Sequence, residues 1–316
     1  MTSIVNTVAN ILHGMNPSLC AIPPRGLDDQ LCYMGPDGTE EGGILCKEIS
    51  YLHAMDVGSW MIKPERHVTE GIVGGVISFL ALIWLVPKLR ATSPPTIRIR
   101  HPKGSPLLSL LCLGCICYYK LSGYKNKIFW LVMPCNMQWV LTVLQCHLVP
   151  ESYKFLQFSI LQIRMSYLMS VVIGLVTPET DDCTQLGELE FYWFNHFALF
   201  VLPIAYIGNG SVSCYPSKHS QCSTLAYNAY WWLFSCILFY LFYFGPVTVM
   251  AIYTGLNLNF MLHPPHNHFL LKGENFRLVA AASLGSLYTV SRLVCLKVEN
   301  AIVGDNNCTK AVTKQQ

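Results

Sequence analysis

The sequence predicts an all-α membrane protein: a polytopic helical bundle of about seven transmembrane helices. Only 12% of the 316 residues are charged, whereas 52% are hydrophobic, and the mean hydropathy is +0.38. Soluble domains carry about 25% charged residues. Apolar runs of about 20 residues, the length that a helix needs to cross a bilayer, recur along the chain. The net charge of +3 comes without a basic, aromatic-laced patch, so no nucleic acid partner is expected.

Residues 1–68 are predicted to lie outside the membrane. A short amphipathic helix is expected at the start, because apolar side chains recur at helical spacing: Ile4, Val5, Val8, Ile11, Leu12 and Met15. Turn signals such as Pro23-Pro24 and Asp37-Gly38 predict an irregular segment over residues 17–67. We expect no cleavable signal peptide, since the first residues lack a cationic start and a continuous apolar core.

The membrane domain is predicted over residues 69–298, with a C-terminal tail over 299–316. The expected spans are 69–87, 105–124, 127–148, 153–176, 188–208, 227–256 and 276–297. The fourth contains Gln157, Gln162 and Arg164, which should face the bundle interior because polar groups are costly in hydrocarbon. Gly245-Pro246 predicts a kink in the sixth.

Lysine and arginine are slightly more numerous in the loops that become cytosolic when the N-terminus lies outside, which favours that orientation. We expect an integral multi-pass protein of the endoplasmic reticulum or another endomembrane. Most of the fourteen cysteines lie in apolar runs, where thiols behave as small hydrophobes. Four lie in loops on one side and can pair in an oxidising lumen, with the pairing left open: Cys20, Cys32, Cys46 and Cys183.

No cofactor is expected, and no metal. The histidines after the sixth span have no accompanying carboxylate and form only one cluster, whereas membrane di-iron sites need several. They are His263, His266 and His268.

Three polar positions are predicted to share one half of the membrane. Cys135 lies eight residues after Lys127 in the third span, and His196 lies eight residues after Glu188 in the fifth. Each is therefore about 12 Å below the same face, at 1.5 Å per residue. The sixth span runs the opposite way, so Asn257-Leu258-Asn259 returns to that face.

These residue types suit nucleophilic chemistry. The His196 imidazole can take the proton of the Cys135 thiol, and amide or phenol groups can stabilise an oxyanion. The candidate donors are Gln138, Tyr192, Asn257 and Asn259. Pro134 is expected to open the helix near the thiol. The plain alternatives are packing for Cys135, a helix–helix hydrogen bond for His196 and helix termination by the two asparagines.

At these residues the sequence resembles the transmembrane protein 164 family. The resemblance covers residues 69–298 and rests on three motifs in order: Met133-Pro134-Cys135-Asn136, Asn195-His196-Phe197-Ala198-Leu199, and Asn257-Leu258-Asn259-Phe260-Met261-Leu262-His263-Pro264. The family cysteine sits in Asn-Pro-Cys-His, so Met133 and Asn136 depart from the pattern. The family is distantly similar to the androgen-induced protein 1 lipid hydrolases.

The resemblance implies a coenzyme-A-independent transacylase that moves an acyl chain from a phospholipid to a lysophospholipid, ether-linked in the family. It implies Cys135 as the nucleophile that forms a thioester and His196 as the base. Oligomeric state stays open. Two alternatives remain: a lipid hydrolase using the same pair, and a small-solute transporter using Arg164 with Gln157 and Gln162. A seven-span receptor is disfavoured because no Asp-Arg-Tyr follows the third span.

Overall fold

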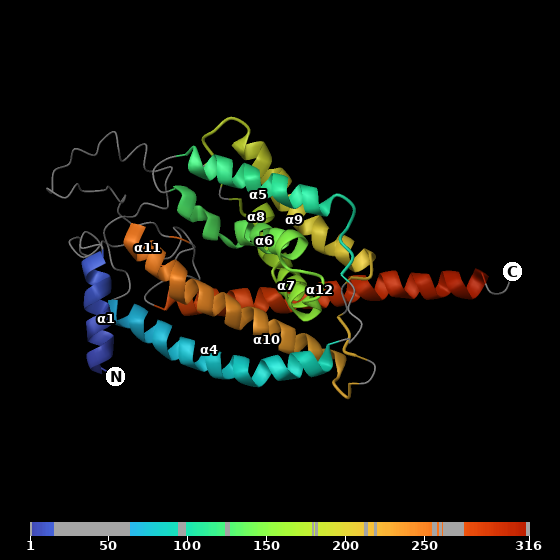
Figure 1. Ribbon diagram of the computed structural model, residues 1–316, viewed down its shortest axis with the longest axis horizontal. Helices are drawn as coiled ribbons and strands as arrows, with labels where there is room; N and C mark the ends of the chain where they lie inside the picture. The colour runs from blue at the N-terminus through green and yellow to red at the C-terminus, as the bar shows by residue number, and fades with distance from the viewer. Residues whose placement is uncertain are drawn as a thin grey trace.

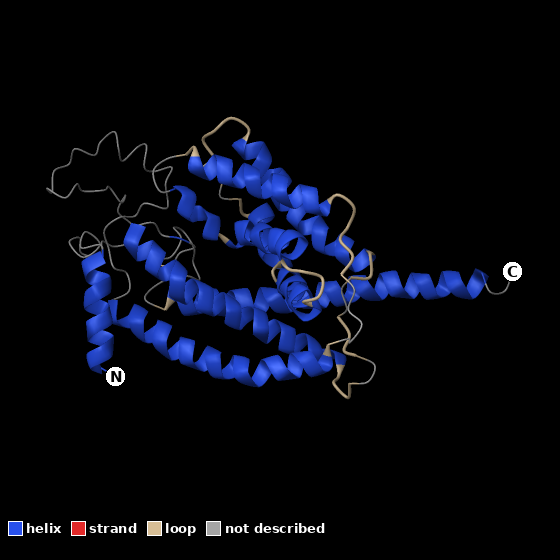
Figure 2. Cartoon of the chain, viewed as in Figure 1, coloured by secondary structure: helices blue, strands red, loops and turns tan. Residues whose placement is uncertain are grey.

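The computed structural model describes residues 2–15, 64–93, 99–123, 127–178, 180, 183–211, 214–217, 220–254, 258, 261 and 275–313. Every regular element within these ranges is a helix, as Figure 2 shows. The predicted all-α membrane bundle is therefore confirmed. The irregular segment predicted over 17–67 falls almost entirely outside the described residues, as do Cys20, Cys32 and Cys46.

Five stretches of helix are long and apolar enough to cross a bilayer within the described residues. They are α4 (Pro64–Thr92), α7 (Lys154–Ser166) with α8 (Leu168–Val176), α9 (Glu188–Gly208), α10 (Thr224–Phe242) with η3 (Tyr243–Val247) and α11 (Thr248–Thr254), and α12 (Phe276–Thr313). These match five of the seven predicted spans.

The second and third predicted spans are shorter or broken. Helix α5 (Ser105–Leu121) has 17 residues, or about 26 Å, against a hydrocarbon core of about 30 Å. The third divides into a 3-10 helix η1 (Lys127–Val132), α6 (Pro134–Val143) and a π-helix η2 (Leu144–Leu148). The count of seven is therefore not confirmed.

Pro134 explains the break. It is the first residue of α6, with Met133 as the N-cap, a position where the missing N–H costs nothing because the first helical amides have no intrahelical acceptor. The expected opening near the thiol takes the form of a break between η1 and α6, with Pro134 as the first residue after the break.

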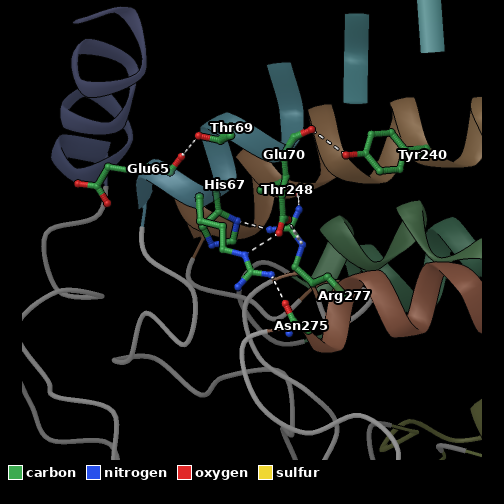
Figure 3. A network of polar contacts seen from close by, with 9 residues as sticks. Glu65, His67, Thr69, Glu70, Tyr240, Thr248, Asn275 and Arg277 are labelled. Atoms are coloured by element: carbon green, nitrogen blue, oxygen red, sulfur yellow. Dashed lines mark hydrogen bonds and ion pairs between the residues drawn. The ribbon is translucent and has the colours of Figure 1, made fainter. Parts of the chain in front are cut away.

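Contacts between segment termini define one end of the bundle, called end A here. Lys127 at the start of η1 pairs with Glu188 at the start of α9, with Nζ 2.6 Å from Oε1. Arg277 at the start of α12 lies 3.6 Å from the Glu70 carboxylate of α4. Figure 3 shows Arg277 pointing toward Glu70, with His67 and Thr248 beside it. The starts of η1, α4, α9 and α12 thus lie at end A.

The opposite end, end B, joins the other termini. The amide of Ser217, before α10, donates to the carbonyl of Thr92 at the end of α4 over 2.9 Å. The Arg100 amide donates to Ser211 Oγ over 2.7 Å. Successive segments therefore alternate in direction, so α6 and α9 both begin at end A and α11 returns there (Figure 1).

The interior carries an unusual polar content. Gln157, Gln162 and Arg164 of α7 are all buried, which confirms the predicted inward orientation. The predicted kink in the sixth span is also confirmed: η3 inserts a π-turn that contains Gly245 and Pro246.

Helix α1 (Thr2–Met15) lies against α4 and α11 and crosses their line at end A (Figure 1). Ala9 and Leu12 are buried there, with Val5 and Val8 packed alongside. The predicted amphipathic helix is present, but its apolar residues divide between two faces. The remaining three stay exposed: Ile4, Ile11 and Met15.

Candidate functional site around Cys135 and His196

Cys135 is the second residue of α6, directly after Pro134. Its half-buried side chain packs against an apolar cluster that includes Trp139, Val171 and Leu199. These neighbours come from α6, α8 and α9.

The break before α6 is held from two sides. The side-chain amide of Asn136 donates to the carbonyl of Trp130 over 2.7 Å. The Tyr243 hydroxyl, from the π-turn, donates to the carbonyl of Val132 over 2.8 Å. The backbone just before Cys135 is thereby held by Asn136 of α6 and by Tyr243 of the π-turn in the sixth span.

His196 is buried in α9, and its orientation is set by Tyr192 and Gly174. Its Nδ1 lies 2.8 Å from the Tyr192 carbonyl. A carbonyl only accepts hydrogen bonds, so Nδ1 carries the hydrogen and Nε2 carries the lone pair. The Tyr192 ring lies against the imidazole, with centroids 4.1 Å apart and ring planes tilted by 36°. A Cβ at Gly174 of α8 would lie 2.8 Å from Nε2, so the glycine provides the space that the ring occupies.

The helices that carry Cys135 and His196 meet at a buried hydrogen bond. Trp139 Nε1 of α6 donates to Asn195 Oδ1 of α9. Trp139 lies one turn after Cys135, and Asn195 immediately precedes His196. Both predicted residues therefore flank the α6–α9 contact at end A.

The thiol and the imidazole are not hydrogen-bonded to each other. Within the described part of the chain, the imidazole's hydrogen bond goes to the Tyr192 carbonyl. Catalytic hydrogen bonds often form only in the complex with substrate, so the arrangement is compatible with a catalytic pair without displaying one.

The other predicted site residues differ in how far the structure describes them. Gln138 is buried on α6. The Tyr192 hydroxyl donates to the Gly174 carbonyl over 2.7 Å, so it must release that bond before it can serve an oxyanion. Asn257 and Asn259 lie outside the described residues, although Leu258 between them is buried in a cluster with Tyr243.

The residues predicted for solute transport bind within the protein. Arg164 Nη1 donates to Gln145 Oε1 over 2.8 Å, and Gln157 donates to the Val149 carbonyl over 2.8 Å. Gln162 accepts from Arg292. These contacts use the groups that a transported solute would need.

A groove of about 440 Å³ opens between α4 and α10, lined by residues that include Glu70, Gly74 and Tyr240. None of the predicted site residues contributes to it. Within the described residues no group of three or more metal-binding side chains comes together, and the histidines at 263, 266 and 268 lie outside them.

Sequence reasoning missed the supporting residues Trp139, Asn195 and Gly174. The first two are 56 positions apart, and spacing along one helix gives no sign of a partner at that distance. Gly174 looked like any glycine in a membrane helix. The sequence signals that could have found the first two were the indole of Trp139 near Cys135 and the amide of Asn195 next to His196.

The chain is similar to known proteins of one family. The profile of the TMEM164 family matches residues 65–293. A curated relative from Dictyostelium discoideum, "Transmembrane protein 164 homolog", is 24% identical over 152 residues, which are 47% of this chain and 48% of the relative. The chain thus spans about half the length of the curated relative it matches. No solved structure matches the chain.

Proposed function

Because the chain belongs to the TMEM164 family, we propose that it is a membrane-embedded phospholipid transacylase with Cys135 as the acyl carrier and His196 as the base. The observation that carries the proposal is the buried Trp139–Asn195 bond, which holds together the helices bearing both residues. The donor is a phospholipid and the acceptor a lysophospholipid, in an endomembrane such as the endoplasmic reticulum.

In the first half-reaction the Cys135 thiol gives its proton to Nε2 of His196, and the sulfur attacks the ester carbonyl of a phospholipid. The bond between the carbonyl carbon and the ester oxygen then breaks, and the departing lysophospholipid oxygen takes the proton from the imidazole. The product on the enzyme is a thioester at Cys135. The lone pair on Nε2, set by the Nδ1 bond to Tyr192, suits this role.

In the second half-reaction a lysophospholipid hydroxyl gives its proton to His196 and attacks the thioester. The C–S bond breaks and the thiolate recovers the proton. Gln138 is the described candidate that can donate to the oxyanion, with Asn257 and Asn259 as further candidates. Water must be kept out, because water attacking the thioester would release a free fatty acid.

The test uses purified protein in liposomes that contain a labelled phospholipid and a lysophospholipid. Cys135→Ala and His196→Ala should each lower acyl transfer by at least about 100-fold, the range for loss of a nucleophile or base. Intact mass should show an acyl group on the wild type and not on Cys135→Ala. Cys117→Ala, which removes another half-buried thiol, should transfer at the wild-type rate.

Acyl transfer by Cys135→Ala at the wild-type rate would refute the proposal. Release of free fatty acid that depends on the same pair would make the protein a hydrolase. Solute flux that depends on Arg164 and survives loss of Cys135 would make it a transporter.

A further inference from the structure

A second thiol contacts an imidazole at end B, at the other end of the bundle from Cys135. Cys146 Sγ of η2 lies 3.4 Å from Nδ1 of His101 and 3.6 Å from the Tyr206 hydroxyl. The phenol lies 2.8 Å from the same ring nitrogen. The three side chains come from η2, the segment before α5 and the end of α9. Unlike the pair at end A, this thiol and imidazole are in direct contact.

The Nδ1 atom of His101 faces both the thiol and the phenol, and each of those groups can donate or accept a hydrogen bond. In the tautomer with the hydrogen on Nε2, the Nδ1 lone pair is placed to take the proton of the thiol. A half-buried thiol is protonated at neutral pH and needs a base in contact before it can attack. His101 meets that need.

The surroundings of His101 favour its neutral form, chiefly through burial. Burial is the main cause that lowers its pKa below the usual value of 6.5, and the Arg164 guanidinium and His147 lower it further, whereas Glu151 raises it. An imidazole with a lowered pKa is unprotonated at pH 7 and is ready to accept a proton.

A buried cation lies beside this cluster, and no carboxylate pairs with it among the residues that the structure describes. Arg164 is 1% exposed, and its guanidinium lies over the Tyr206 ring at 5.2 Å. It donates to Gln145, and its Nε has no hydrogen-bond partner in the described structure. A positive charge of this kind lowers the energy of a nearby thiolate and of an oxyanion.

The surroundings of Cys146 combine a lipid-facing surface with exposed cations. Leu107, Leu110 and Leu148 are exposed on α5 and η2, where an acyl chain can lie. Arg100, Lys103 and Lys154 are exposed in the flanking segments, where they attract anionic groups. We propose that Cys146, activated by His101, accepts a long-chain acyl group from an acyl thioester whose carrier is phosphorylated.

In the proposed step the Cys146 proton passes to Nδ1 of His101, and the sulfur attacks the carbonyl of the acyl thioester. The carbonyl bond to the carrier sulfur breaks, and the carrier leaves as a thiol after taking the proton from the imidazole. A thioester on Cys146 replaces the thioester on the carrier, so no oxidant or reductant is needed.

The test uses full-length protein in lipid nanodiscs with palmitoyl-coenzyme A as the probe, in the Cys135→Ala background so that the two thiols are read separately. Peptide mass analysis should find a hydroxylamine-labile palmitoyl group on residue 146. His101→Gln should slow its formation at least tenfold. Cys222 is the matched control, because it is another half-buried thiol at end B whose Sγ lies 3.5 Å from a backbone carbonyl; it should stay unmodified.

A second measurement guards against a variant that fails to fold. The rate at which iodoacetamide alkylates Cys146 in the same background should rise with pH through the pKa of His101, below 6.5, rather than near 8.5 as for an isolated thiol. Absence of acyl on residue 146, equal acylation of Cys222, or an alkylation profile centred near 8.5 would each overturn the proposal.

Discussion

At the scale of single residues, the His196 ring is held by a backbone carbonyl on one side and a glycine on the other. Its depth in the bundle could be predicted by counting from Glu188, since helices have a fixed rise. Its tautomer could not, because the tautomer follows from which nitrogen meets the Tyr192 carbonyl.

We predict that Gly174→Ala lowers acyl transfer without removing the protein from the membrane. The new methyl group would lie 2.7 Å from Cδ2 and 2.8 Å from Nε2 of His196, so the imidazole must shift. Displacement of a catalytic group by about 1 Å costs up to about 100-fold in rate, and we expect a loss of roughly 10- to 100-fold. Transfer is measured in liposomes.

The matched control is Gly114→Ala in α5, where an added Cβ meets nothing within 4 Å. It should transfer at the wild-type rate. Equal activity of the Gly174 and Gly114 variants would mean that His196 does not need its present position.

A pH dependence is predicted for His101. Its pKa is lowered, chiefly by burial and then by Arg164, so the unfolded chain binds more protons than the folded one just below pH 6.5. The free energy of unfolding should therefore be fully maintained above that pH and fall as the pH drops through this window.

Thermal unfolding of the purified protein between pH 5 and 7.5 measures the effect. His101→Gln cannot titrate at this site and should show a flatter dependence than the wild type. If stability depends on pH in the same way in the wild type and in His101→Gln, the lowered pKa of His101 does not contribute to the pH dependence of stability.

At the scale of elements, the third predicted span differs most from the structure, which divides it into η1, α6 and η2. Its hydropathy suits a continuous span, but proline is equally suited to the interior of a kinked helix and to its first residue. The structure uses the second, because Asn136 and Tyr243 satisfy the carbonyls of Trp130 and Val132. Tyr243 is distant from Val132 in sequence, and nothing in the sequence indicates that the Asn136 side chain bonds to the Trp130 carbonyl. The break could therefore not be predicted.

By contrast, the inward face of α7 and the kink at Gly245-Pro246 followed directly from the sequence. Buried amides and an arginine in a long apolar run have only one inexpensive direction to face. A Gly-Pro pair within a helix removes a helical hydrogen bond.

The ion pair between η1 and α9 is predicted to be needed for stability. Lys127 and Glu188 are 0% and 5% exposed in their side chains. Removing one partner leaves a buried charge, which costs about 3–5 kcal/mol in the free energy of unfolding. Lys127→Met should lose about that much, as measured by unfolding in mixed detergent micelles.

Lys127→Met combined with Glu188→Met should regain most of the lost stability, because no buried charge remains unpaired. Lys154→Met, at an exposed lysine, should change stability by less than about 0.5 kcal/mol. A double variant as unstable as the sum of both single variants would contradict the pairing.

At the scale of the whole molecule, the two ends of the bundle hold different pairs of cysteine and histidine. End A holds Cys135 and His196, and end B holds the contact between Cys146 and His101. The two thiols lie eleven positions apart by numbering, yet α6 and η2 between them carry the chain from one end to the other. Because successive helices alternate in direction, Cys135 lies toward end A and Cys146 toward end B.

The last prediction tests that alternation. Epitopes inserted at the N-terminus and between residues 181 and 182 should be on the same side of the membrane, because α1 packs against the end A portion of α4 and α11 and Glu188, shortly after residue 182, pairs with Lys127 at end A. Epitopes after Ser217 and at the C-terminus should be on the other side. Ser217 contacts Thr92 at end B, and α12, which begins at end A and is 38 residues or about 57 Å long, extends beyond end B (Figure 1).

Antibody access after selective opening of the plasma membrane distinguishes the sides. With the N-terminus outside the cytosol, as the lysine and arginine distribution favours, the epitopes at end B are stained first and those at end A only after the inner membranes are opened. The reverse order would mean that the protein has the opposite orientation in the membrane, with the same epitopes still sharing a side. Staining of the N-terminal and 181–182 epitopes at different stages would instead contradict the alternating direction of the helices. Cys135 and His196 would then not share one half of the membrane, as the proposed function requires.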